Sequence, residues 1–108
     1  MWMNEYEIED AAARYASDPV MGPAVATLAN LVEWVNSNSD GWPYWQAPSK
    51  ASANLQDLVQ RQQAYDRSAF SRPRPEPVTA ADVVKALRPL KAFRTRHGAT
   101  FTIVTPSA

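Results

Sequence analysis

The acidic residues near the start of the chain are the densest group of side chains that could do chemistry. Four carboxylates lie close together: Glu5, Glu7, Glu9 and Asp10. Carboxylates at this spacing can hold a divalent cation or act as an acid–base pair. They also suit the first turns of a helix, where the helix dipole favours negative charge. We therefore expect an exposed, helix-stabilising role for them.

Few other side chains in the sequence could take part in catalysis or bind a metal. His97 is the single histidine and has no partner at metal-ligand spacing, so an exposed turn residue is expected. The chain has no cysteine, no glycine-rich phosphate loop and no G-x-S-x-G motif. We predict no catalytic residue, no metal, no cofactor and no enzyme activity. An enzyme site assembled only by the fold would require a polar cleft.

Basic residues gather toward the end of the chain. The last five bases are followed by no acid, and they are Lys85, Arg88, Lys91, Arg94 and Arg96. A helix followed by a basic hairpin is how the wing of a winged-helix protein begins, and such a surface can hold phosphate. The alternatives are a solvated cationic face and a surface that pairs with acidic residues. A DNA-binding regulator that uses Lys85–Arg96 is our second functional hypothesis.

A third group of candidates is aromatic. Residues 34–48 read W-V-N-S-N-S-D-G-W-P-Y-W-Q-A-P, with large rings around a polar turn. Tryptophan and tyrosine are enriched at interface hot spots, and they also complete the cores of small domains. We expect Trp34 and Trp45 to lie in the core. The candidates for contact with a partner are Trp42, Tyr44 and Trp2.

The elements that must position these side chains are mostly helices. Hydrophobic spacing predicts them at about 4–17, 23–36, 50–67 and 80–88. Asn4 with Glu7, and Thr79 with Asp82, have the spacing of capping boxes. The second helix is the most apolar and is predicted to be the core helix. The residues expected to face inward include Ile8, Ala11, Tyr15, Val25, Leu28, Leu31, Leu55, Val59, Val83, Val84 and Leu87.

Two segments break the helical pattern. Residues 71–78 alternate proline with other residues, which favours an extended strap; a peptide ligand for another protein is the alternative. Pro89 is expected to stop or kink the fourth helix. Residues 100–105 are rich in β-forming types, so a short hairpin is predicted at about 91–105, with Gly98 in its turn.

Charge is unevenly distributed along the chain. The 108 residues carry no net charge and are 45% hydrophobic, which fits a single domain over residues 1–108. Residues 1–40 contain seven acids and one base, whereas residues 41–108 contain ten bases and four acids. This dipole suggests that the acidic start and the basic end of separate copies associate head to tail. Such association should weaken as salt rises.

Targeting signals are absent from the sequence as given. No apolar run approaches the roughly 20 residues of a membrane span. The residues M-W-M-N-E at the start lack the basic and apolar regions of a signal peptide. With no cysteine either, we expect a cytoplasmic location and no membrane contact.

Three stretches carry a family resemblance: N-E-Y-E-I-E-D-A-A-A-R-Y-A at 4–16, D-P-V-M-G-P-A at 18–24 and N-S-D-G-W-P-Y-W at 38–45. They resemble small proteins of unknown function from actinobacteriophages, especially mycobacteriophages. The similarity covers mainly residues 4–60, and no catalytic or binding residues come with it. The resemblance implies a cytoplasmic phage accessory protein that acts inside a bacterial host.

We predict a mainly α domain, a bundle of three to four helices with a short C-terminal β-hairpin. The leading functional prediction is a non-enzymatic interaction protein. Its partner would be a host protein or a second copy of the chain, which would make it a homo-oligomer.

Overall fold

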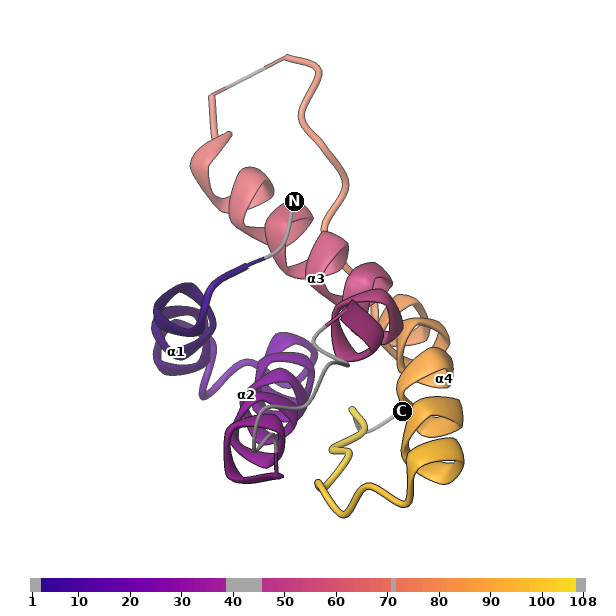
Figure 1. Ribbon diagram of the computed structural model, residues 1–108. Coiled ribbons are helices and arrows are strands. Elements are labelled where there is room, and N and C mark those ends of the chain that lie inside the picture. Colours follow the sequence, from indigo (N-terminus) through magenta and orange to yellow (C-terminus); the bar gives the residue numbers. More distant parts are fainter. Residues whose placement is uncertain (1–2, 39–45, 71, 107–108) are drawn as a thin grey trace.

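The computed structural model describes residues 3–38, 46–70 and 72–106, with only the backbone for residues 46–49 (Figure 1). Its helices are α1 (Glu5–Arg14), α2 (Met21–Asn38), α3 (Gln46–Arg67) and α4 (Ala80–His97). α2 packs against both α1 and α3, and α4 packs against α3. The predicted mainly α bundle is therefore confirmed. α1 and α4 lie on opposite sides of the molecule (Figure 1).

The predicted capping box starts α1. The Asn4 side chain accepts a hydrogen bond from the Glu7 backbone N–H at 2.9 Å, and Glu7 Oε1 accepts one from the Asn4 N–H at 3.3 Å. These bonds satisfy two backbone donors that the first turn of a helix leaves unpaired. Ile8 and Ala11 are then buried on the inner side of the helix.

Asp18 and Gly22 bring α2 close to the end of α1. Asp18 Oδ1 accepts hydrogen bonds from the backbone N–H groups of Val20 and Met21, both at 2.8 Å. A Cβ at Gly22 would lie 3.0 Å from the carbonyl oxygen of Tyr15. Because that oxygen belongs to the backbone, any larger residue would push the two helices apart.

A single core connects the four helices and the C-terminal segment. Its buried side chains include Ile8, Val25, Leu28, Leu31, Leu55, Val59, Val83, Leu87, Leu90 and Phe101. Val84 was predicted to face inward, but it is 40% exposed. Successive helical side chains point about 100° apart because a turn holds 3.6 residues. With Val83 in the core, Val84 must turn outward.

The predicted hairpin is wrong, because α4 continues through Pro89. The helix ends only at Gly98, whose left-handed φ of 61° closes it. A proline inside a helix costs about 3 kcal/mol. Leu90 and Phe93 lie beyond it and are both buried. Burying each of these side chains stabilises the folded chain by about 1.5–3 kcal/mol. The segment predicted as the first strand therefore forms the last turns of α4.

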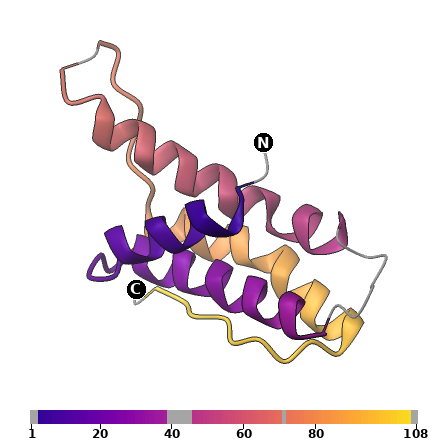
Figure 2. The same cartoon turned by 60° about the vertical axis from the view of Figure 1, so that its left-hand side comes forward.

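The segment predicted as the second strand, residues 100–105, has no strand partner in the described part of the chain. It runs alongside α2 (Figure 2). Thr27 Oγ1 accepts a hydrogen bond from the Val104 N–H at 2.9 Å, and Asn30 Nδ2 donates one to the Thr102 carbonyl at 3.0 Å. Helix side chains thus take the place of a neighbouring strand.

The end of α3 and the strap that follows it project beyond the other helices (Figures 1 and 2). We call this projection, residues 65–70 and 72–78, the arm. With it the molecule measures 46 × 27 × 21 Å along its principal axes. The guanidinium carbon of Arg74 lies 3.8 Å from the ring centroid of Tyr65, which links the returning strap to the helix.

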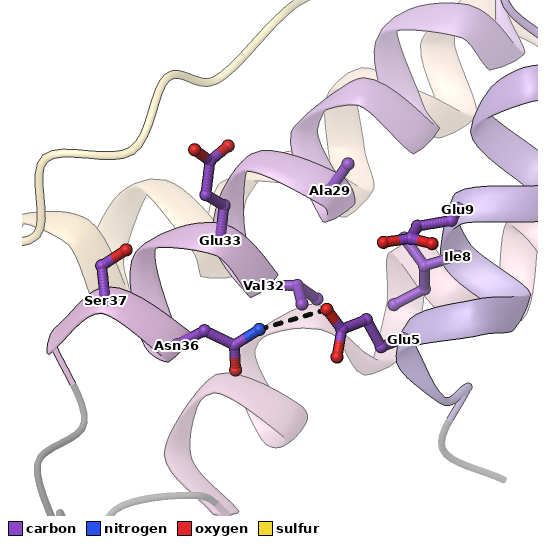
Figure 3. Close-up of a pocket in the computed structure, with 8 residues that line it drawn as sticks. All are labelled: Glu5, Ile8, Glu9, Ala29, Val32, Glu33, Asn36 and Ser37. Atoms are coloured by element: carbon purple, nitrogen blue, oxygen red, sulfur yellow. Dashed lines mark hydrogen bonds between the residues drawn. The ribbon is translucent and has the colours of Figure 1, made fainter.

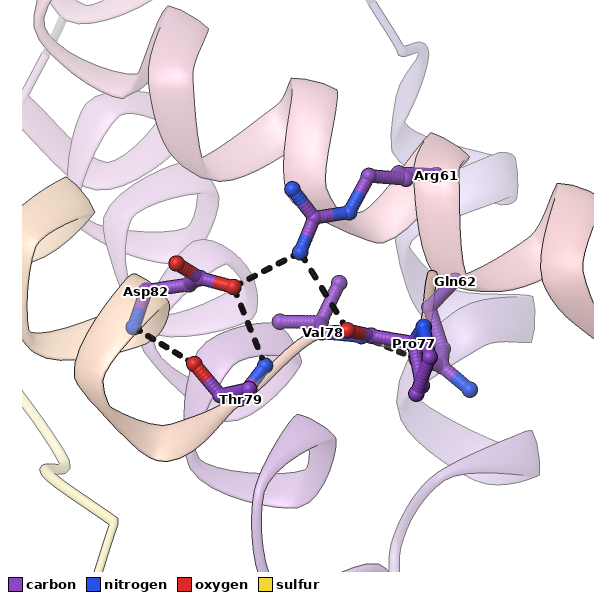
Figure 4. Close-up of polar contacts among 6 residues, drawn as sticks. All are labelled: Arg61, Gln62, Pro77, Val78, Thr79 and Asp82. Carbon is purple, nitrogen blue, oxygen red and sulfur yellow. Dashed lines mark hydrogen bonds and ion pairs between the residues drawn. The ribbon is translucent and has the colours of Figure 1, made fainter. Parts of the chain in front are cut away.

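Polar contacts fix the base of the strap to α3 where α4 begins (Figure 4). The Val78 N–H donates to Gln62 Oε1 at 3.0 Å. Thr79 and Asp82 form the predicted capping box, with both bonds at 3.2 Å. Arg61 Nη2 donates to Asp82 Oδ2 at 2.7 Å. The Thr79 N–H and then the Arg61 guanidinium hold the pKa of Asp82 below its usual value.

Candidate functional site

A groove of about 300 Å³ lies between α1 and the second half of α2. Its base is apolar, since Ile8 is buried and Ala29 and Val32 are half-buried. The polar side chains around this base are Glu5, Glu9, Glu33, Asn36 and Ser37 (Figure 3). The groove therefore combines an apolar base with an acidic rim.

Helical spacing brings these side chains to the groove from both sides. Positions i, i+3 and i+4 of a helix share one face. On α1 these positions are occupied by Glu5, Ile8 and Glu9. On α2 the positions i, i+3, i+4 and i+7 are occupied by Ala29, Val32, Glu33 and Asn36. The buried faces of the two helices thus determine where their carboxylates lie.

The negative charge of the rim is only partly engaged. Glu5 Oε1 accepts a hydrogen bond from Asn36 Nδ2 at 3.3 Å. Glu9 and Glu33 are exposed, and neither makes a hydrogen bond or ion pair with the described part of the chain. Among the described residues, these two carboxylates are therefore unpaired.

The arrangement suits a cationic side chain rather than a metal ion. Within the described ranges, no group of three or more histidine, cysteine, aspartate or glutamate side chains is placed to hold a metal. Arginine and lysine have an apolar stem and a charged end, so they can pack on an apolar base and pair with carboxylates at its rim. His97 lies elsewhere, exposed in the last turn of α4.

The fold divides the acidic cluster that the sequence presents. Glu7 belongs to the capping box of α1, and Asp10 forms an exposed ion pair with Arg14 at 3.5 Å. The other two members line the groove, where Glu33 of α2 joins them. Sequence reasoning missed Glu33. Its place beside the half-buried Val32, at the edge of the apolar face of α2, was the available signal.

The predicted nucleic-acid residues lie on one helix instead of a helix and a hairpin. Four of them are exposed on α4, and we call them the basic α4 face: Lys85, Arg88, Lys91 and Arg96. Arg94 is half-buried, and its Nη1 donates to the Phe101 carbonyl at 3.5 Å. A wing is absent from the described residues, so any phosphate contact would come from the helix itself.

The aromatic candidates are only partly described. Outside the described residues lie Trp2, Trp42, Tyr44 and Trp45. Trp34 is half-buried against the core, and its ring centroid lies 6.2 Å from those of Phe93 and Phe101. This agrees with the core position predicted for Trp34.

Phe70 is a further candidate that sequence reasoning missed. It lies at the tip of the arm and is 100% exposed. Three bases near it in the sequence, Arg67, Arg72 and Arg74, are exposed as well. Phe70 follows the end of α3 at Arg67, and the polar residues Asp66 and Arg67 shortly before it were the available sequence signal.

Comparison with known proteins does not name a family. No protein-family model matches the chain, and searches of curated proteins and of solved structures give no match. Among the described helices, none has the length and apolar character needed to cross a membrane.

Proposed function

We propose that the chain is a non-enzymatic interaction protein, and that it binds a cationic part of a protein partner in the groove between α1 and α2. The observation that carries this proposal is the pair Glu9 and Glu33. Both carboxylates are exposed and unpaired within the described chain, and both border the apolar base at Ile8 and Val32. A partly apolar surface with a polar rim is typical of protein contacts.

The physical basis is the loss of water when a partner covers the groove. An ion pair on an open helix face contributes little, because water screens it. A guanidinium that rests on Val32 would displace water from the base, and its N–H groups would form charge-assisted hydrogen bonds with Glu33. Charge would then select the partner, while the apolar base would contribute affinity.

The resemblance to actinobacteriophage proteins supports an accessory role in an infected bacterium. It covers mainly residues 4–60, which include α1, α2 and hence the whole groove. In this proposal the partner is a host protein in the bacterial cytoplasm or a second copy of the chain.

The test is capture of partners from an actinobacterial lysate by the immobilised chain. Glu33→Lys reverses one rim charge, and Asp57→Lys is the matched control, because Asp57 is an exposed acid on α3 away from the groove. A protein retained by the wild type and by Asp57→Lys, but lost with Glu33→Lys, supports the proposal. Equal retention by all three proteins would contradict it.

A second candidate function is nucleic-acid binding by the basic α4 face. The favouring observation is that four cations are exposed along a single helix. Such binding should release counterions and fall steeply with salt. An electrophoretic shift at low salt that is lost with Arg88→Ala/Lys91→Ala supports this function, and no shift at low salt removes it.

A further inference from the structure

We propose that the groove receives the arm of a second copy of this chain, with Phe70 seated on the groove base. The proposal rests on the use of the groove for protein binding and names the partner as the chain itself. The contact would be heterologous, because one copy contributes the arm and the other contributes the groove.

The turn before Phe70 is closed by hydrogen bonds. The Tyr65 carbonyl accepts hydrogen bonds from the Ser68 N–H at 3.1 Å, from Ser68 Oγ at 2.8 Å and from Arg74 Nη2 at 3.3 Å. The Arg74 guanidinium also stacks on the Tyr65 ring. A backbone turn that is already closed loses less conformational freedom when the side chain that follows it docks.

The root of the arm is attached to the rest of the molecule. The Tyr15 hydroxyl donates to Asp66 Oδ2 at 2.5 Å, and Gln62 Nε2 donates to Asp66 Oδ1 at 3.1 Å. Gln62 in turn accepts from the Val78 N–H. Both segments of the arm, the end of α3 and the returning strap, are thus fixed at their base. The direction of the arm is therefore set by α1 and α3.

Charge makes the arm and the groove complementary. Arg67, Arg72 and Arg74 give the arm a positive surface, whereas three glutamates give the groove a negative rim. The arm also carries two acids: Asp66 is engaged by Tyr15 and Gln62, and the exposed Glu76 offsets one of the three positive charges. The exposed ring of Phe70 in turn matches the apolar groove base.

Phe70 does not occupy the groove of its own chain, since it is 100% exposed. The basic α4 face is the other cationic surface, but its neighbouring apolar side chain is Val84, which is only 40% exposed. A projecting ring fits a groove better than a flat helix face does. The arm of another copy is therefore the favoured occupant, and every added copy leaves one arm and one groove open for growth.

Sedimentation of the full chain over a range of concentrations tests this proposal. The wild type should form species larger than a dimer as concentration rises, and weakly, because the contact is small. Phe70→Ala and Glu9→Lys/Glu33→Lys should each weaken assembly about tenfold or more. Arg88→Glu/Lys91→Glu is the control and should assemble like the wild type. All of these residues are exposed, so thermal melts should show the variants folded.

Mixing the two defective variants gives the decisive measurement. Phe70→Ala keeps an intact groove, and Glu9→Lys/Glu33→Lys keeps an intact arm. An equimolar mixture should therefore form one-to-one dimers and nothing larger. A mixture that stays monomeric at concentrations where the wild type assembles would overturn the proposal.

Two other results would also overturn it. Assembly that survives Phe70→Ala but is lost with Arg88→Glu/Lys91→Glu would assign the groove to the basic α4 face. A wild type that is monomeric at every concentration would exclude a second copy as the partner. In that last case, lysate capture that depends on Glu33 would still support protein binding in the groove, so the two proposals can fail separately.

Discussion

Carboxylates in two regions of the molecule have opposite surroundings. At the α3–α4 junction, Asp82 bonds to the Thr79 N–H and to Arg61, and it helps to start a helix. At the α1–α2 groove, Glu9 and Glu33 bond to nothing in the described chain. The junction carboxylate makes contacts that stabilise the fold, whereas the two groove carboxylates make no such contact within the described chain. Substitutions in the two regions should therefore separate stability from binding.

The largest expected effect lies in the core that supports both regions. Leu87 on α4 is 0% exposed, so Leu87→Ala should lower the free energy of unfolding by about 2–5 kcal/mol. Val32→Ala at the half-buried groove base should cost clearly less. Urea denaturation of both variants measures the difference. Equal losses would show that the groove base is as essential to folding as the core.

Asp66 extends the comparison, because its carboxylate is exposed yet engaged. Tyr15→Phe removes the hydroxyl that donates to it and should cost about 1.5 kcal/mol, the low end for a charged acceptor, since the bond from Gln62 remains. Burial first, and then the adjacent Asp66 carboxylate, raise the pKa of Tyr15 above its ordinary value of 10.0.

The raised pKa also predicts a pH dependence. The folded chain holds the Tyr15 proton more tightly than the unfolded chain, so this contribution to stability is complete below pH 10.0 and is lost as pH rises beyond it. Denaturation at neutral and alkaline pH should show a smaller alkaline loss for Tyr15→Phe than for the wild type. Identical pH profiles would contradict the Tyr15–Asp66 contact.

Local signals explain how much of the fold was predictable. Asn4 with Glu7 and Thr79 with Asp82 act within one turn of helix, so both capping boxes could be predicted from spacing alone. Pro89 misled the prediction, because its cost is local whereas the burial of Phe93 that offsets it depends on the whole core. Gly98 was recognised as a residue suited to positive φ, but the same property serves a helix end as well as a hairpin turn.

The candidate site was less predictable than the fold. Glu5 and Glu9 could be placed on one helix face, but whether Glu33 lines the same groove depends on how α1 packs against α2. That packing depends on buried side chains of both helices and on the close approach of Gly22 to the Tyr15 carbonyl, which no periodic pattern reveals. The exposure of Phe70 likewise depends on α3 extending beyond the neighbouring helices. That extension is set by the relative lengths of the helices and not by local sequence.

A smaller effect is expected at the junction carboxylate. Asp82→Asn removes a charge from a partly exposed ion pair and should cost less than about 1 kcal/mol at neutral pH. The pKa of Asp82 is lowered in the folded chain, so its contribution is present above its ordinary value of 3.8 and is lost as pH falls below it. Asp82→Asn should reduce this loss of stability at acid pH, and Glu33→Gln should leave the loss unchanged.

The smallest effect on stability is expected at the groove rim. Glu33→Lys breaks no hydrogen bond or ion pair of the described chain, so the free energy of unfolding should stay within about 0.5 kcal/mol of the wild type. Any change should be a gain at low salt, because the new cation would line the same groove as Glu5 and Glu9, and the gain should vanish as salt screens the charges. Urea denaturation of Glu33→Lys and Asp57→Lys at low and high salt measures this. A loss above about 1 kcal/mol would give Glu33 a structural role, and reduced binding by the variant would then no longer identify a recognition residue.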